Sequence, residues 1–227
     1  MRAAIRSPDP PWEATVKPVP FDYFCPENLE EACELLAGQE GARPLAGGQT
    51  LIPMLAMRLA RPAKLIDINR ISQLKGIQVL DDGGLWIGAG TRQVTVERSA
   101  EVRARLPLLA KAIVWVGHPP TRARGTVGGS VANADPAAEI PLVALVSDAV
   151  IEARVEDETE ELEMDDYFIA PMVTAVPDGG LVTGLRFPAP PPGRFGTAFT
   201  EVSARRGDFA FVSAAAQVAL DAEGNCT

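Results

Sequence analysis

The sequence has little histidine, few cysteines and no long apolar run, and each scarcity excludes a class of protein. Only His118 and three cysteines, Cys25, Cys33 and Cys226, occur among the 227 residues. The cysteines are odd in number and show no CxxC spacing, so the usual ligand sets of zinc and iron–sulfur sites are absent from this chain, as is a disulfide framework. We therefore expect no metal site here and reduced thiols, as in cytoplasmic proteins.

The longest apolar stretches, residues 51–59 and 141–146, fall well short of the roughly 20 residues that a membrane-spanning helix needs. Residues 1–20 contain no continuous apolar core of the signal-peptide kind. The 30 acidic residues outnumber the 21 basic ones, and a net charge of -9 weighs against a nucleic-acid partner. We expect an acidic cytoplasmic protein with no membrane span.

The spacing of apolar residues predicts a mixed α+β fold. Asn28 is a plausible N-cap for the first helix, and Pro107 interrupts a later helical stretch. The acidic run at 156–163 is typical of a solvated turn and strand edge. Helices are predicted at 28–37, 51–59, 94–116 in two pieces and 141–147, and strands at 43–46, 64–71, 76–80, 85–88, 150–155, 198–203 and 211–220.

A proline-rich stretch, PAPPP at 188–192 followed by Gly193, is typical of a linker. A further turn is predicted at 221–224, after which a strand has barely begun when the sequence stops. A strand that short cannot pair its backbone groups, so we expect the natural protein to continue past Thr227.

Two segments share an unusual pattern of adjacent glycines followed by a polar residue: Ala46 to Thr50 and Thr126 to Ser130. Paired glycines remove the Cβ atoms that keep a phosphate away from backbone N–H groups. A helix that begins at Leu51 would add its amino-terminal dipole. One such segment is weak evidence, because Gly-Gly is common in turns. Two of them favour a diphosphate gripped from both sides, and hence a dinucleotide.

The better-known phosphate loops do not match. Gly88-Ala89-Gly90 begins like GxGxxG, but Gln93 stands at the sixth position and no acidic ribose partner follows at the expected spacing. The sequence also lacks GxxxxGK[ST], which excludes a P-loop nucleotidase.

Several blocks resemble one family. They are PFDY at 20–23, LAGGQTLIPM at 45–54, RLARP at 58–62, LIDIN at 65–69 and GHPPTRARGTVGGSVANADPAAEIP at 117–141. Together they are similar to the medium, FAD-binding subunit of the carbon monoxide dehydrogenase and xanthine dehydrogenase family of molybdenum hydroxylases, over about residues 18–220.

This resemblance implies an α+β fold, a two-subdomain FAD-binding module of the PCMH type, followed by a partial carboxy-terminal α+β lobe. The expected divisions are an amino-terminal arm at 1–17, the FAD-binding domain at 18–187 with a subdomain boundary near 72–76, the linker at 188–193 and the start of the carboxy-terminal lobe at 194–227.

The resemblance also implies the cofactor site. The two glycine segments would hold the FAD diphosphate, and two acidic residues after the second would lie near the adenosine half. The predicted residues are Leu45, Ala46, Gly47, Gly48, Gln49, Thr50, Leu51, Ile52, Thr126, Val127, Gly128, Gly129, Ser130, Asp135 and Glu139.

In such complexes a large molybdopterin subunit hydroxylates the substrate and a small subunit carries two [2Fe–2S] clusters, commonly in a dimer of heterotrimers. The flavoprotein would pass electrons from the clusters to an external acceptor, so no catalytic acid, base or nucleophile is expected in this chain. The sequence does not specify the substrate, nor NAD, quinone or oxygen as the acceptor. A stand-alone FAD-dependent oxidase and a flavin-free interaction module stay open as alternatives.

Some positions depart from the family pattern. Glu201 stands where the family often has a lysine that can approach the flavin ring, and Asn133 stands where histidine is frequent. We expect His118 to be a hydrogen-bonded loop residue, and Arg122 and Arg124 to pin the second glycine segment to neighbouring carboxylates.

Overall fold

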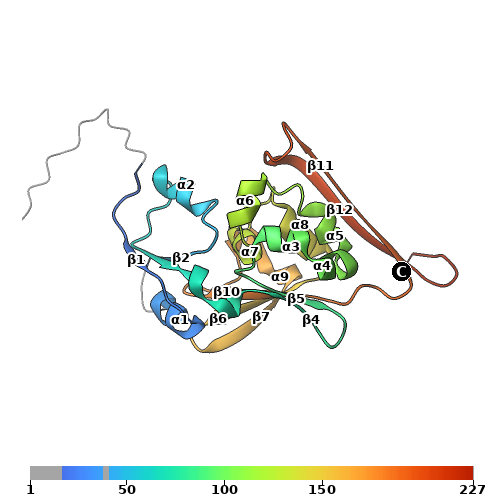
Figure 1. Cartoon of the computed structure of the whole chain (residues 1–227), viewed down its shortest axis with the longest axis horizontal. Coiled ribbons are helices and arrows are strands. Elements are labelled where there is room, and N and C mark those ends of the chain that lie inside the picture. Colours follow the sequence, from blue (N-terminus) through green and yellow to red (C-terminus); the bar gives the residue numbers. More distant parts are fainter. Residues whose placement is uncertain (1–16, 38–40, 227) are drawn as a thin grey trace, which may run out of the picture.

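The computed structural model describes residues 17–37 and 41–226, and its first unit is a small parallel sheet. In the sheet the strand order is β1 (Asp22–Phe24), β3 (Lys64–Asp67) and β2 (Ala42–Leu45) (Figure 1). Along the chain, α1 (Leu29–Ala37) connects β1 to β2, and α2 (Leu51–Ala56) connects β2 to β3. Asn28 caps α1 as predicted, because its side-chain oxygen accepts a hydrogen bond of 2.9 Å from the N–H of Glu31.

Two elements of this unit are shorter than predicted. The strand expected over 64–71 ends at Asp67, whose side chain accepts from the N–H of Asn69 and turns the chain into the 3-10 helices Ile68–Arg70 and Ser72–Leu74. The helix expected over 51–59 ends at Ala56, and Arg58 has a left-handed φ of 58° that a continuing helix does not allow.

The second unit is a five-stranded sheet whose neighbouring strands are all antiparallel. The predicted hairpin at 76–88 and the strand at 150–155 are confirmed, and the acidic run forms an edge strand, where its charges discourage pairing with another chain. In sheet order the strands are β4 (Ile77–Val79), β5 (Leu85–Gly88), β10 (Leu181–Phe187), β6 (Val150–Val155) and β7 (Glu158–Glu163).

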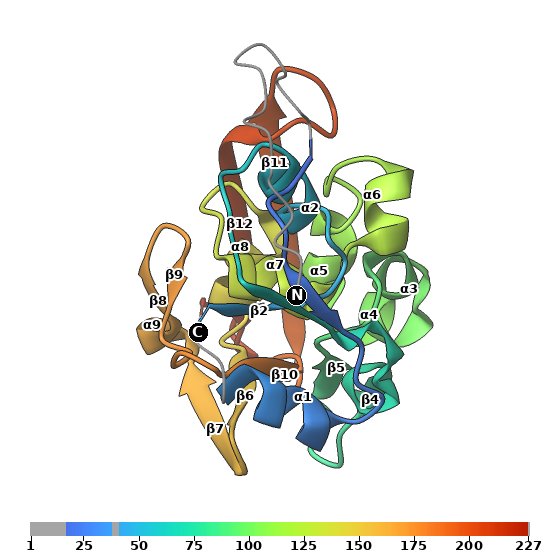
Figure 2. The same ribbon diagram turned by 90° about the vertical axis from the view of Figure 1, so that its left-hand side faces the viewer.

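A layer of short helices covers one side of the five-stranded sheet, and α1 lies on the other side (Figures 1 and 2). The helical stretch at 94–116 breaks twice, at Pro107 and also at Ser99, whose hydroxyl caps the next helix by accepting from the N–H of Val102 at 3.1 Å. The helices are α3 (Gln93–Arg98), α4 (Ala100–Arg105), α5 (Pro107–Ala112), α6 (Pro119–Arg124), α7 (Val127–Asn133), α8 (Glu139–Val146) and α9 (Met164–Tyr167).

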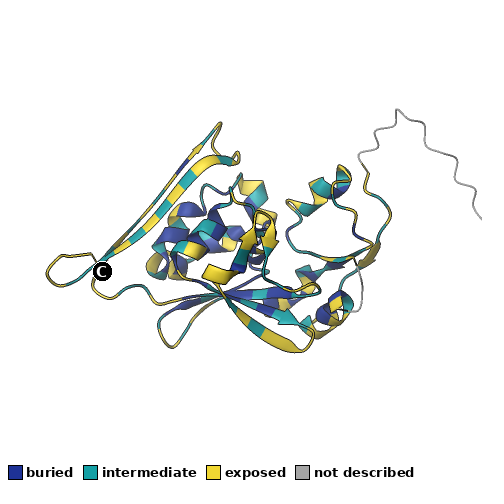
Figure 3. Cartoon of the chain, turned by 180° about the vertical axis from the view of Figure 1, so that it is seen from behind, coloured by how far each residue is buried: buried dark blue, intermediate teal, exposed yellow. Residues whose placement is uncertain are grey.

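The main core lies between this helical layer and the sheet, where apolar side chains such as Leu108, Val143, Ile151 and Leu185 are fully buried (Figure 3). A smaller core joins α1 to the parallel sheet and includes Cys33. Both glycine segments therefore start from elements that are anchored in a packed core.

The last described element is a long antiparallel hairpin of β11 (Arg194–Ser203) and β12 (Ala210–Leu220), which packs beside α5 and α8. Residues 188–193 form no regular helix or strand. A minor two-stranded sheet, β8 (Phe168–Ala170) with β9 (Val173–Thr174), lies next to α9.

Candidate cofactor site

The two glycine segments, about 80 residues apart in the chain, are in contact. A Cβ atom placed on Gly47 would lie 2.5 Å from the carbonyl oxygen of Arg124 and 2.8 Å from the Cα atom of Gly125. A Cβ atom on Gly129 would lie 3.6 Å from that of Ala46. Only glycine allows the backbones to approach so closely at position 47, so the sequence pattern has a direct steric cause.

The first segment presents a run of free backbone donors. Within the described part of the chain, the N–H groups of Gly47, Gly48, Gln49, Thr50 and Leu51 have no hydrogen-bond acceptor. Gly48 has a φ of 70°, and Thr50, the N-cap of α2, makes no side-chain capping bond. Successive N–H groups around a left-handed residue form a concave nest that binds anions.

The second segment differs from the prediction of a glycine turn, because α7 begins inside it. Its N–H groups are already used: Val127 donates to the oxygen of Thr91 at 3.1 Å, and Gly128 donates to the oxygen of Ala89 at 2.9 Å. Gly128 is also packed against Ala89, where a Cβ atom would clash. Glycine is needed at position 128 because α7 packs closely on Ala89 there, and not because its backbone is open to a ligand.

The remaining donors of this helix end are capped by Thr126. The N–H of Gly129 donates to the Thr126 hydroxyl at 3.1 Å, and the N–H of Ser130 donates to the Thr126 carbonyl at 3.2 Å. The partly exposed Ser130 hydroxyl makes no hydrogen bond among the described residues. The second segment thus offers one partly exposed glycine, Gly129, and the Ser130 hydroxyl, whereas the first offers backbone donors.

A polar network that we did not predict joins the two segments. The Asn69 side-chain amide donates to the carbonyl of Ala46 at 2.7 Å, and its oxygen accepts from Arg92 at 2.6 Å. Arg92 also donates to the carbonyl oxygen of Arg124. Asn69 belongs to the LIDIN block but was predicted to lie within a strand, and nothing in the sequence marks Arg92 as its partner.

Asp67 anchors this network. Its two carboxylate oxygens accept from the Tyr23 hydroxyl at 2.6 Å and from the side-chain amide of Asn69 at 2.6 Å. Burial by itself raises the pKa of Asp67, but the hydrogen bonds from Tyr23 and Asn69 and the nearby Arg92 outweigh it and leave the pKa below its ordinary value. The carboxylate therefore stays ionised and holds Asn69 in place at neutral pH.

Two predicted acidic residues follow α7. Asp135 accepts from the N–H of Ala137 at 2.9 Å and so closes the turn into α8. Glu139, the first residue of α8, is 9% exposed, and burial raises its pKa to about 7, with Glu201 and Asp135 adding to the increase.

Glu201, which stands where the resemblance suggests lysine, is 8% exposed on β11. Both of its side-chain oxygens are buried and receive no hydrogen bond from the described residues. Burial raises its pKa as well. The hairpin thus brings a second buried carboxyl group into the electrostatic surroundings of Glu139, which the sequence flagged only as a departure.

The segment before α7 is pinned as expected at one of its two arginines. Buried Arg122 forms an ion pair of 2.9 Å with Glu97 and donates to the carbonyls of Val116 and Gly117. The side chain of Arg124 is exposed and makes no ion pair within the described ranges. His118 lies against the hairpin turn, since a Cβ atom on Gly207 would lie 2.7 Å from its ring.

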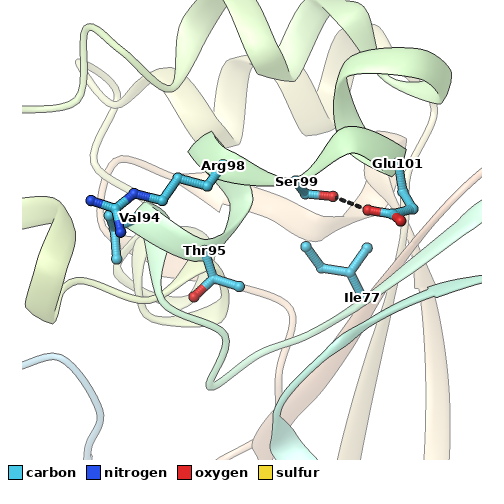
Figure 4. Close-up of a pocket in the computed structure, with 6 residues that line it drawn as sticks. All are labelled: Ile77, Val94, Thr95, Arg98, Ser99 and Glu101. Atoms are coloured by element: carbon cyan, nitrogen blue, oxygen red, sulfur yellow. Dashed lines mark hydrogen bonds between the residues drawn. The ribbon is translucent and has the colours of Figure 1, made fainter.

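A cavity of about 450 Å³ lies away from these segments, between β4 and the helices α3 and α4 (Figure 4). Two of its polar groups are paired with each other, since the Ser99 hydroxyl donates to the Glu101 carboxylate at 2.7 Å. It shares no lining residue with the predicted site. The lining residues are Ile77, Val94, Thr95, Arg98, Ser99 and Glu101.

Residues 19–190 match the family model described as the FAD binding domain in molybdopterin dehydrogenase. The chain belongs to this family. It is 39% identical over 213 residues to the 6-hydroxypseudooxynicotine dehydrogenase complex subunit alpha of Paenarthrobacter nicotinovorans, a match that covers 93% of this chain and 71% of the relative. It is 36% identical to the carbon monoxide dehydrogenase medium chain of Afipia carboxidovorans, with 92% and 72% covered.

The fold agrees with solved relatives. The carbon monoxide dehydrogenase from Hydrogenophaga pseudoflava that lacks the Mo-pyranopterin moiety superposes with a TM-score of 0.88 at 33% identity, covering 92% of this chain and 72% of that one. Quinoline 2-oxidoreductase from Pseudomonas putida 86 gives 0.86 at 32% identity.

The predicted resemblance and the α+β fold are confirmed: the chain is an FAD-binding medium subunit of the molybdenum hydroxylase family, a flavoprotein oxidoreductase component. Within the described residues, none of the helices has the length and apolar character to cross a membrane.

Proposed function

We propose that the chain holds the FAD diphosphate chiefly through the backbone of residues 47–51. The observation that carries this proposal is the run of five neighbouring N–H groups without an acceptor among the described residues, beside a left-handed Gly48. A diphosphate needs several donors that converge from one side, and such a nest supplies them without any side-chain charge. The residues present therefore fit the group that the family binds.

The second segment has a different proposed role. Because the N–H groups of residues 127–130 are already bonded within the chain, Gly129 provides close approach and Ser130 a hydroxyl donor. We place Asp135 and Glu139 toward the adenosine half, as the resemblance implies. A Glu139 carboxyl with a pKa of about 7 is partly protonated near neutral pH and can donate or accept a hydrogen bond there.

The chain acts in this proposal as the electron-exit subunit of a molybdenum hydroxylase complex. When bound, FAD supplies a two-electron carrier between [2Fe–2S] clusters on a small partner subunit and an external acceptor. The protein's own task is to retain and orient the cofactor. A large molybdopterin subunit hydroxylates the substrate, and the three chains assemble as a dimer of heterotrimers in the cytoplasm.

The experiment is to isolate this chain from its native host under mild conditions and to identify the chains that co-elute with it. We expect a molybdopterin subunit, a [2Fe–2S] subunit and a flavin absorption band that bleaches when the substrate of the complex is added. A chain that turns over a substrate alone, with oxygen as the acceptor, would show instead that it is an independent oxidase. A chain that purifies without flavin absorption and without partner chains would instead support a flavin-free interaction module.

A further inference from the structure

The polar network around Asn69 is built so that it ties one glycine segment to the other. Asn69 lies in the 3-10 helix after β3, and its side-chain amide donates to Ala46, the residue just before the nest. Arg92 lies just before α3 and donates both to Asn69 and to the Arg124 carbonyl. That carbonyl is the same oxygen that faces Gly47. The network and the glycine contact thus hold the same two stretches of backbone.

The orientation of the Asn69 amide is fixed by its partners. Its NH2 group faces two acceptors, the Ala46 carbonyl at 2.7 Å and the Asp67 carboxylate at 2.6 Å, while its oxygen faces the guanidinium of Arg92. The opposite orientation would place oxygen against oxygen twice and donor against donor once. Asn69 is therefore a rigid connector, because each of its polar atoms has a complementary partner.

Arg92 makes two hydrogen bonds at once that a lysine ammonium could not make in the same geometry. Its two terminal nitrogens bond to two different acceptors, the Asn69 side-chain oxygen and the Arg124 carbonyl. A guanidinium presents these donors in a planar fork of fixed geometry, whereas a lysine ammonium is a point charge on a flexible stem. Bridging two backbone segments at a set separation therefore requires arginine at this position.

We infer that Asn69 and Arg92 are positioning residues that set the separation of residues 46–48 from residues 124–125 and thereby shape the FAD diphosphate site. This inference rests on the proposed function, since it assigns these side chains to that same site. Neither residue needs to touch the cofactor. They act on it through the carbonyls of Ala46 and Arg124.

The test measures FAD affinity of the 227-residue chain by flavin fluorescence, together with the urea midpoint of the FAD-free chain. The variants are Asn69→Leu, Arg92→Met, Arg92→Lys and the double variant Asn69→Leu/Arg92→Met. Arg70→Gln is the matched control, because Arg70 is in the same 3-10 helix and its one interaction with the residues that the structure describes is an exposed ion pair of 3.7 Å with Glu27.

We expect each single replacement to weaken FAD binding by about 10- to 100-fold, the range for lost hydrogen bonds to charged groups. The double variant should lose little more than the worse single one, because either change already breaks the connection. Arg92→Lys should fail to rescue binding, although it keeps the charge. Arg70→Gln should bind FAD like the wild type.

Several outcomes would overturn the inference. Additive losses, or full rescue by Arg92→Lys, would mean that the side chains act separately or by charge alone. Losses matched by equal falls in the urea midpoint would mean that the residues only support folding. If a Leu or Met variant does not fold, Asn69→Ser and Arg92→Lys decide the same question. If the wild-type chain binds no FAD, the proposed function is wrong. If the wild type binds FAD tightly and the variants bind it with the same affinity, only this inference is wrong.

Discussion

Replacing Gly47 with alanine tests the contact between the two glycine segments by adding a single methyl group. The new Cβ atom would lie 2.5 Å from the Arg124 carbonyl oxygen, and real Cβ atoms essentially never come within 3.0 Å of another heavy atom. The neighbour is backbone held by Arg92, so a simple side-chain rotation cannot relieve the overlap. The segments must separate by at least about 0.5 Å, the difference between these two distances.

Overpacking of this kind costs about 1–3 kcal/mol. If the FAD-free chain relieves the strain by separating the segments, the cost falls on cofactor binding, where about 1.4 kcal/mol is a tenfold change. We therefore expect Gly47→Ala to weaken FAD binding by roughly 5- to 150-fold, as measured by flavin fluorescence titration.

Gly196→Ala is the matched control, because its Cβ atom on β11 would meet nothing within 4 Å. This variant should bind FAD like the wild type. Unchanged FAD affinity in Gly47→Ala, with its urea midpoint also unchanged, would refute the reasoning, because the two segments would then not be in the contact described.

Three further predictions concern other parts of the site. Gly48→Val and Gly129→Val should each abolish FAD retention during purification, since the first strains a φ of 70° and the second places a Cβ atom 2.6 Å from the Thr126 hydroxyl oxygen and beside Ala46; normal flavin content in both would mean that the segments are only turns. In urea unfolding of the FAD-free chain, the unfolding free energy of Glu139→Gln minus that of the wild type should rise by about 3 kcal/mol as the pH rises from about 4 to about 8. Arg122→Met should cost about 2–4 kcal/mol of unfolding free energy, because it leaves Glu97 and two carbonyls unpaired, and a loss within 0.5 kcal/mol of zero would contradict the pinning role.

Proton binding by Glu139 sets the direction of this pH dependence. Burial raises the pKa of Glu139 from 4.5 to about 7. Between these values the folded chain holds a proton that the unfolded chain has released, so the wild-type stability contribution of Glu139 falls as the pH rises through this window. Glutamine carries no titrating proton. A constant stability difference across the range would show that Glu139 titrates normally.

The sequence predicted where the two glycine segments lie in the chain, but it could not distinguish their roles. Adjacent glycines look alike whether they free N–H groups, as at Gly48, or allow close packing, as at Gly128 against Ala89. The distinction depends on which acceptors lie nearby in space. Those acceptors, on Ala89 and Thr91, lie just after strand β5, and no local pattern reveals that they approach residues 127 and 128.

Contacts between distant side chains were the other part beyond prediction. Helix and strand boundaries shifted where a side chain capped the backbone, as Ser99 and Asp67 do, because capping competes with apolar periodicity at the ends of elements. Arg92 gained its significance from hydrogen bonds to Asn69 and Arg124, and Glu201 from its burial near Glu139, in both cases far along the chain. A polar residue's role in such a site depends on tertiary geometry, whereas the apolar pattern that builds the scaffold is local.

The most direct test of the central claim is an amide NMR titration of the isotope-labelled chain with FAD. We predict that the largest shifts occur at the backbone N–H groups of residues 47–51, which are free of acceptors within the described chain, and that those of residues 127–130, which keep their acceptors, shift less. Unperturbed amides at 47–51 in a chain that binds FAD, with the shifts centred elsewhere, would contradict the account.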